Sequence, residues 1–158
     1  MGPLENGEKE MGARDAVWNA IKWKFIKKRL GYTNEEMTIF RNNPSNENVL
    51  NKAPEIQKKT IIAEIVESHG CNSQHAVGDK FYFDGAGNLL TKLCPSKICV
   101  YALNAISMQV FTAGELILAG VDPNEMRFKR ASCFDVGLEC GGWGRIAIEI
   151  SVEERLKA

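Results

Sequence analysis

The chain has 158 residues and a mass of 17.6 kDa, which suits one domain with at most a helical attachment. Its composition, 44% hydrophobic and 25% charged, is typical of a globular protein that buries a core without disulfides. Twenty basic residues balance twenty acidic ones, and no apolar run approaches the roughly 18 residues of a membrane span. We therefore expect no nucleic-acid partner and no membrane span.

The first third of the sequence predicts a disordered tail and then a helical arm. Residues 1–11 are polar and rich in Gly, Pro and Glu, with little to bury, so they are expected to be the tail. Residues 12–57 are expected to be the arm. Its first helix should run over 13–30, because Gly31 is a favourable residue directly after a helix.

Two more helices are expected in the arm. Thr33 and Glu36 fit a capping box, which predicts a helix over 34–41, and a short third helix is expected near 47–51. The apolar residues of the first helix cover more than one face, which indicates burial against protein. We therefore expect the arm to dock on a second copy of the chain or on a partner enzyme.

From residue 58 the apolar pattern changes to the period of strands, so residues 58–158 predict an α+β domain. Its helical stretch and its strands are expected at 95–119 (one or two helices) and at 60–67, 80–83, 127–132 and 145–152. Because the strands flank the helical stretch, we expect a small, largely antiparallel sheet with a helical insert, preceded by the N-terminal helical arm.

All thiols and imidazoles of the chain lie in its second half. They belong to Cys71, Cys94, Cys99, Cys133, Cys140, His69 and His75. The odd number of cysteines and the polar, acidic start of the sequence favour reduced thiols and a cytoplasmic location. Cys99 falls in the predicted helical stretch and is expected to be a core residue.

Cys71 and His75 lie four residues apart in a predicted loop directly after a strand. Cys94 and Cys133 also follow predicted strands, so side chains from three loops could converge. Zinc and iron prefer thiolate and imidazole donors at about 2.0–2.3 Å. The sequence therefore predicts a zinc or iron site made by Cys71, His75, Cys94 and Cys133.

Two other interpretations of these residues stay open. In the first interpretation, the cysteines are small buried hydrophobic residues and His75 is hydrogen-bonded to backbone. In the second, His75 lowers the pKa of the Cys71 thiol and makes it a nucleophile in a metal-free site. Asp79 either closes the turn before the next strand or orients His75. The catalytic candidates are therefore Cys71, His75 and Asp79.

The segment 140–144 contains three glycines and Trp143. Glycines let a backbone approach a ligand closely, and the indole of Trp143 offers a flat stacking face. Trp143 is therefore a candidate cofactor-binding residue in a pocket wall, and the alternative is a tight turn with a packed Trp. Asp135 is a further candidate acid or base.

The residues around Cys71 resemble a small, uncharacterised prokaryotic domain family with the pattern C-x-x-G-H-x-V-G-D-x-[FW]. The residues that carry the resemblance are Cys71, His75, Val77, Gly78, Asp79 and Phe81, followed by Cys94, Pro95 and Cys133. It covers roughly residues 60–152, and the arm resembles an extended form of the family. The chain departs from the pattern at Gln74, where Gly is usual, and at Ala76, where a basic residue is common. The resemblance implies a shared site at Cys71, His75, Asp79, Cys94 and Cys133 without identifying its chemistry.

Three functions follow as hypotheses. The first is an enzyme or enzyme subunit in which bound zinc or iron polarises a small substrate or activates water. The second is a non-catalytic accessory subunit that docks on a larger enzyme through the arm. The third is a metal-free Cys–His catalyst.

Overall fold

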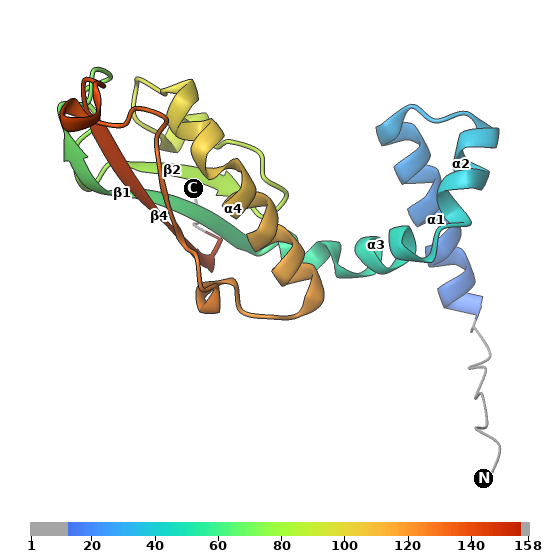
Figure 1. The fold of residues 1–158 in the computed structure, drawn as a ribbon. Coiled ribbons are helices and arrows are strands. Elements are labelled where there is room, and N and C mark those ends of the chain that lie inside the picture. Colours follow the sequence, from blue (N-terminus) through green and yellow to red (C-terminus); the bar gives the residue numbers. More distant parts are fainter. Residues whose placement is uncertain (1–12, 156–158) are drawn as a thin grey trace, which may run out of the picture. The chain divides into compact units, whose positions relative to one another are not determined.

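The computed structural model describes residues 13–155, so the predicted tail lies outside the described residues (Figure 1). The contacts divide the chain into two compact units, one up to Asn48 and one from Val49 onward. We call them the helical unit and the α+β unit. The predicted class, an α+β protein with an N-terminal helical arm before an antiparallel sheet, is confirmed.

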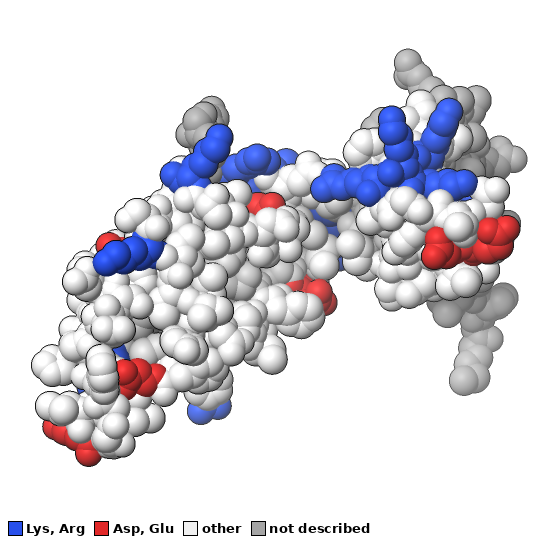
Figure 2. Space-filling view, turned by 90° about the horizontal axis from the view of Figure 1, so that it is seen from above, with Lys and Arg blue, Asp and Glu red and all other residues white. Residues whose placement is uncertain are grey.

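The helical unit begins with α1 (Ala13–Leu30), which has the predicted bounds and ends at Gly31, whose φ is 73°. A left-handed residue at this position favours glycine because it has no Cβ to clash. The last turn of α1 is basic, which suits the negative end of the helix dipole. Figure 2 shows Lys and Arg side chains gathered on this unit.

Helix α2 (Asn34–Arg41) also has its predicted bounds. The predicted capping box is present: Thr33 N donates to the Glu36 carboxylate at 2.7 Å, and Glu36 N donates to the Thr33 hydroxyl at 3.2 Å. These bonds satisfy amides that the first turn of a helix cannot pair. The core of the helical unit includes Trp23, which packs edge to face against Phe40.

Helix α3 (Pro44–Gln57) is longer than the predicted helix at 47–51. Pro44 occupies the first position of the helix, where no backbone N–H is needed, and Pro54 lies inside it. Beyond Pro54, Ile56 packs on the core of the α+β unit. Gly85 makes this approach possible, since a Cβ built there would lie 2.1 Å from the Ile56 carbonyl oxygen.

The α+β unit contains four antiparallel strands, β1 (Lys59–His69), β2 (Lys80–Asp84), β3 (Arg130–Ser132) and β4 (Arg145–Glu154), in the order β2-β1-β4-β3. Strand β1 runs past its predicted end because its pairing with β4 continues beyond a bulge at Ile65/Glu67 to the pair His69–Arg145. Only three residues of the predicted strand 127–132 pair as β3.

One helix, α4 (Val100–Ala119), covers one face of this sheet (Figure 1). The main core residues of the sheet and of α4 are Ile61, Ala63, Ile65, Phe81, Phe83, Ile146, Ile148, Ile150, Val152, Ala102, Ile106, Val110, Ala113 and Ile117. Gly114 lies within the helix without breaking it, and Gly120 ends it with a φ of 76°. By length and composition, α4 is also a helix that could cross a membrane, while one of its faces forms this core.

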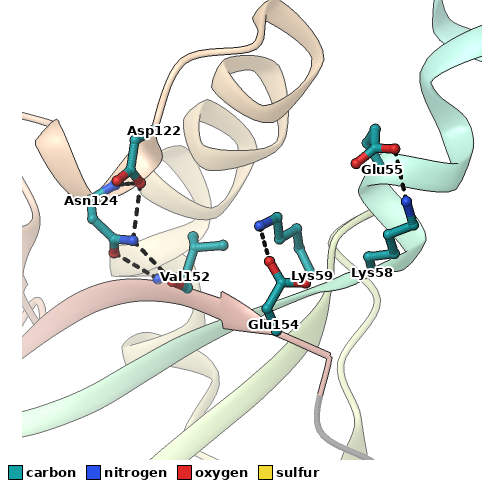
Figure 3. Close-up of polar contacts among 7 residues, drawn as sticks. All are labelled: Glu55, Lys58, Lys59, Asp122, Asn124, Val152 and Glu154. Atoms are coloured by element: carbon teal, nitrogen blue, oxygen red, sulfur yellow. Dashed lines mark hydrogen bonds and ion pairs between the residues drawn. The ribbon is translucent and has the colours of Figure 1, made fainter.

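Polar side chains at one end of the sheet form hydrogen bonds and ion pairs with one another and with the backbone of β4 (Figure 3). Asn124 Nδ2 donates to Val152 O, and Val152 N donates to Asn124 Oδ1, both at 2.9 Å. An amide side chain thus takes the place of a strand neighbour along β4 beyond the short β3. Lys59 and Glu154, which face each other on β1 and β4, form an ion pair at the same end.

Candidate functional site

The loops at the other end of the sheet enclose a pocket of about 550 Å³ in the α+β unit. Its lining comes from residues 71–73 after β1, 99–101 at the start of α4, 133–136 after β3 and 142–146 at the start of β4. Antiparallel pairing explains why these segments meet, because β1 and β3 both end beside the beginning of β4. We call this cavity the thiol pocket, since Cys71, Cys99 and Cys133 all line it.

The carboxylate of Asp135 organises the loop between β3 and β4. It accepts hydrogen bonds from the backbone N–H groups of Gly137 (3.0 Å), Trp143 (3.0 Å) and Gly144 (3.1 Å). The Gly137 and Gly144 amides, with a smaller contribution from Trp143, hold the pKa of the Asp135 carboxyl below its ordinary value. Asp135, a candidate acid or base from the sequence, is therefore an ionised carboxylate committed to its own loop.

Two glycines let this loop close. A Cβ built at Gly142 would lie 2.0 Å from Asp135 Oδ1, so any larger residue would displace that carboxylate. A Cβ built at Gly144 would lie 2.2 Å from the carbonyl oxygen of Gly70. The Gly-rich segment is thus a tight turn, as one reading of the sequence held, and it also forms a wall of the pocket.

Aromatic side chains make the pocket largely apolar. Tyr101, Phe134 and Trp143 line it and remain 63%, 61% and 76% exposed. Exposed aromatic groups gathered around a concave surface are typical of ligand-binding sites. Figure 2 shows few charged side chains on the face of the α+β unit that it presents. Trp143, the cofactor-binding candidate, therefore stands where a flat ligand could stack on it.

Cys99 occupies the position directly before the first residue of α4, as its N-cap. Partial burial raises the pKa of its thiol, but the Ser73 hydroxyl and the Ala102 and Tyr101 amides outweigh this effect, so the pKa is lowered. The Ser73 hydroxyl has the largest lowering effect and the N–H groups at the start of the helix add to it, because both stabilise a thiolate. The sequence predicts Cys99 as a core residue of a helix; it lies directly before α4, is half-buried against the core and also lines the pocket.

His75 lies outside the thiol pocket, on the core side of its loop. The residue is only 4% exposed. Its ring stands edge to face with the ring of Phe81, with 5.3 Å between the ring centroids. Its Nδ1 lies 3.6 Å from Asp79 Oδ2, and among the described residues its buried Nε2 has no hydrogen-bond partner.

Asp79 has the turn-closing role that the sequence offered as one alternative. Its carboxylate accepts a hydrogen bond from Ala76 N at 3.0 Å, and Gly78 beside it has a φ of 93°. Its carbonyl oxygen accepts from Ile65 N at 2.9 Å, which ties the turn to β1. The same carboxylate faces His75, so the orienting role of Asp79 is compatible with this geometry.

Cys94 also lies apart from the thiol pocket. Its Sγ accepts from Tyr82 N at 3.4 Å and donates to Leu90 O at 3.3 Å, which fastens the segment after β2 to that strand. Cys71 and Cys133, the other two predicted metal ligands that carry thiols, both line the pocket and are partly buried against the core. Among the side chains that the structure describes, no three of His, Cys, Asp or Glu group in a way that could hold a metal ion. The four-residue metal site remains a prediction.

Sequence reasoning missed that Cys99 lines the pocket and that Asp135 has a structural role. One signal for Cys99 was available: it immediately precedes the long apolar run 100–119 that forms α4. Comparison of the chain with family models, with curated proteins and with solved structures finds no match to any of them.

Proposed function

We propose that the α+β unit binds a small, mainly apolar molecule in the thiol pocket, and that the Cys99 thiolate reacts with it as a nucleophile. The observation that carries this proposal is the position of Cys99, at the N-terminus of α4 and in the lining of an aromatic cavity. A cavity of about 550 Å³ lies within the size range of small-molecule sites.

The proposal needs no imidazole to activate the thiol. A cysteine usually becomes nucleophilic beside a base or where its thiolate is stabilised by a helix N-terminus. His75 lies in the core against Phe81, whereas Cys99 has the α4 amides and the Ser73 hydroxyl. The proposal therefore keeps thiol catalysis, one of the three functions predicted from the sequence, and moves its nucleophile from Cys71 to Cys99.

The reaction of Cys99 with matched electrophiles tests the proposal. Chloroacetamide and its N-(2-naphthyl) derivative both alkylate a thiolate: the sulfur bonds to the CH₂ carbon, the C–Cl bond breaks and chloride leaves. Only the second compound has an aromatic body. We expect the naphthyl compound to label Cys99 with saturation kinetics and about tenfold faster than chloroacetamide, because its body binds before the reaction. Peptide mapping by mass spectrometry gives the rate at each cysteine.

Cys140 provides the internal control, since its thiol is exposed and lies outside the pocket lining. We expect the two reagents to label Cys140 at similar rates. Trp143→Ala should reduce the preference for the naphthyl compound at Cys99 and leave Cys140 unaffected. If the ratio of the labelling rates of the two reagents is the same at Cys99 as at Cys140 in the wild-type protein, the proposal is contradicted.

A second proposal concerns the helical unit, which we expect to dock on a second copy of the chain or on a partner enzyme. The observation that favours it is the exposure of large apolar side chains at Ile21, Phe25 and Ile39. Light scattering after size-exclusion chromatography tests self-association. Phe25→Glu should reduce the mass of any oligomer; a monomeric wild-type protein that also retains no partner on pull-down would argue against docking.

A further inference from the structure

Arg145 is the charged group of the thiol pocket that has no partner of its own. It lies at the start of β4, lines the pocket and is exposed. Among the side chains that the structure describes, its guanidinium has no ion-pair or hydrogen-bond partner. By contrast, Arg130 on the neighbouring strand pairs with Glu149 at 2.6 Å. The five N–H donors of Arg145 are thus available to a molecule in the pocket.

The organised loop positions this side chain. A Cβ built at Gly137 would lie 3.7 Å from Arg145 Cδ, so the arginine stem passes directly beside the Gly137 backbone. Gly137 N in turn donates to Asp135 Oδ1 at 3.0 Å. The stem therefore rests on a segment that a carboxylate holds in place, which reduces the entropy lost when the guanidinium binds a ligand.

The lining carries one acidic and one basic side chain, and of the two only the basic one has free hydrogen-bond donors among the described residues. Asp135 is the acidic residue of the lining, and its two oxygens already accept from the backbone amides of Gly137, Trp143 and Gly144. The lining contains no lysine, so Arg145 carries its positive charge. A guanidinium with free donors matches the planar, two-oxygen geometry of a carboxylate.

We propose that the thiol pocket selects a small carboxylate with a flat aromatic body, and that Arg145 binds the carboxylate. The aromatic side chains of Tyr101, Phe134 and Trp143 supply the surface for the flat body. This inference rests on the proposed function, since it names the class of molecule that lies beside Cys99. It does not depend on whether Cys99 goes on to react.

Binding of 2-naphthoate and 2-naphthamide to the full chain tests the inference, because the two compounds share a body and differ in charge. In titration calorimetry at pH 7, we expect 2-naphthoate to bind about tenfold more tightly than 2-naphthamide. Arg145→Gln should bring the two dissociation constants within a factor of about two of each other. Arg145→Lys should keep part of the preference for 2-naphthoate, because the positive charge remains although the planar set of guanidinium N–H donors is lost.

Arg130→Gln is the matched control, because it also removes an exposed guanidinium but lies outside the pocket lining, and it should leave the preference intact. Circular dichroism confirms that each variant is folded. Equal binding of the two compounds to the wild-type chain would overturn the inference while leaving an apolar pocket in place. Failure of both to bind would also overturn it, and labelling of Cys99 by the naphthyl chloroacetamide would then decide separately about the proposed function.

Discussion

The backbones of Gly70 and Gly144 touch where β1 leaves the sheet and β4 enters it. A Cβ built at Gly144 would lie 2.2 Å from both the carbonyl carbon and the carbonyl oxygen of Gly70. The adjacent residues His69 and Arg145 form the last pair of the β1–β4 ladder. This contact brings the loop that carries Cys71 against the loop that carries Trp143, and both loops line the thiol pocket.

Replacing Gly144 by alanine should therefore destabilise the α+β unit. The new methyl group can be accommodated only if two backbone segments separate, and overpacking of this kind costs about 1–3 kcal/mol. Gly114→Ala is the matched control, because the same methyl group in α4 would meet its nearest atom, Gly85 O, at 3.5 Å. There alanine should stabilise the helix by about 0.5–1 kcal/mol. Chemical denaturation measures the free energy of unfolding of both variants, which should fall for Gly144→Ala and rise for Gly114→Ala. A Gly144→Ala protein as stable as the wild type would show that the contact is unimportant.

The role of Asp135 predicts a dependence of stability on pH. Its folded-state pKa lies below the ordinary value of 3.8, so its stabilising effect is complete above that value. The effect is lost as the pH falls below 3.8 through the folded-state pKa. Asp135→Ala should lower the melting temperature by several degrees at pH 7, and Asp135→Asn by less, because one acceptor oxygen remains.

The difference in melting temperature between wild type and Asp135→Asn should narrow as the pH falls below 3.8, when the carboxylate becomes protonated. Thermal melts at a series of pH values measure it. A difference that stays constant from pH 7 to pH 3 would mean that the charge of Asp135 contributes nothing to the loop.

Gln74 predicts a stabilising substitution. Among the described residues it is the one non-glycine with a positive φ, 62°, and its side chain accepts a hydrogen bond from Lys97 Nζ at 2.8 Å. Left-handed geometry costs a residue with a Cβ about 1–2 kcal/mol, which exceeds the extra chain entropy that glycine loses on folding. Gln74→Gly also loses the exposed Lys97 hydrogen bond, so the net rise in the free energy of unfolding should be about 0.5 kcal/mol.

Gln74→Ala is the companion variant, since it keeps the strain and loses the hydrogen bond to Lys97. It should be less stable than the wild type. Urea denaturation ranks the three proteins, and an alanine variant more stable than the glycine variant would contradict the strain argument.

The predicted zinc or iron site has a direct test in elemental analysis of protein purified without oxygen. Because Cys94 and His75 have other contacts, the account expects the metal content to be well below one equivalent and unchanged by Cys71→Ser. One equivalent of zinc or iron that disappears in Cys71→Ser would establish the metal site instead. It would also require the loops at Cys71 and Cys133 to rearrange around the ion.

Local signals predicted the elements best. Gly31 and the Thr33–Glu36 capping box gave the ends of α1 and the start of α2 correctly, because both act through neighbouring residues. The helix predicted at 47–51 was too short, because Pro44 suits the first position of a helix and Pro54 is accommodated inside α3. Whether a proline ends a helix or begins one depends on the residues that pack around it.

The site was predicted only in part, for a reason of geometry. The strand order brings Cys71 and Cys133 to one pocket, as reasoning from loops at strand ends suggested. The rotation of a side chain cannot be read from spacing, and His75 turns toward Phe81 instead. Cys99 was missed because its surroundings depend on one residue of helix register: as the residue directly before α4 it lies at the helix N-terminus, where Ser73 and the first-turn amides lower its pKa.

The rate of iodoacetamide labelling at each cysteine as a function of pH tests the central claim, a reactive thiolate at Cys99, most directly. The account predicts that Cys99 reaches half its maximal rate below the ordinary thiol pKa of a model cysteine peptide, and that Ser73→Ala moves this midpoint upward. Near pH 7 it should be labelled before the more exposed Cys140. A midpoint for Cys99 at or above that of the model peptide would contradict the account.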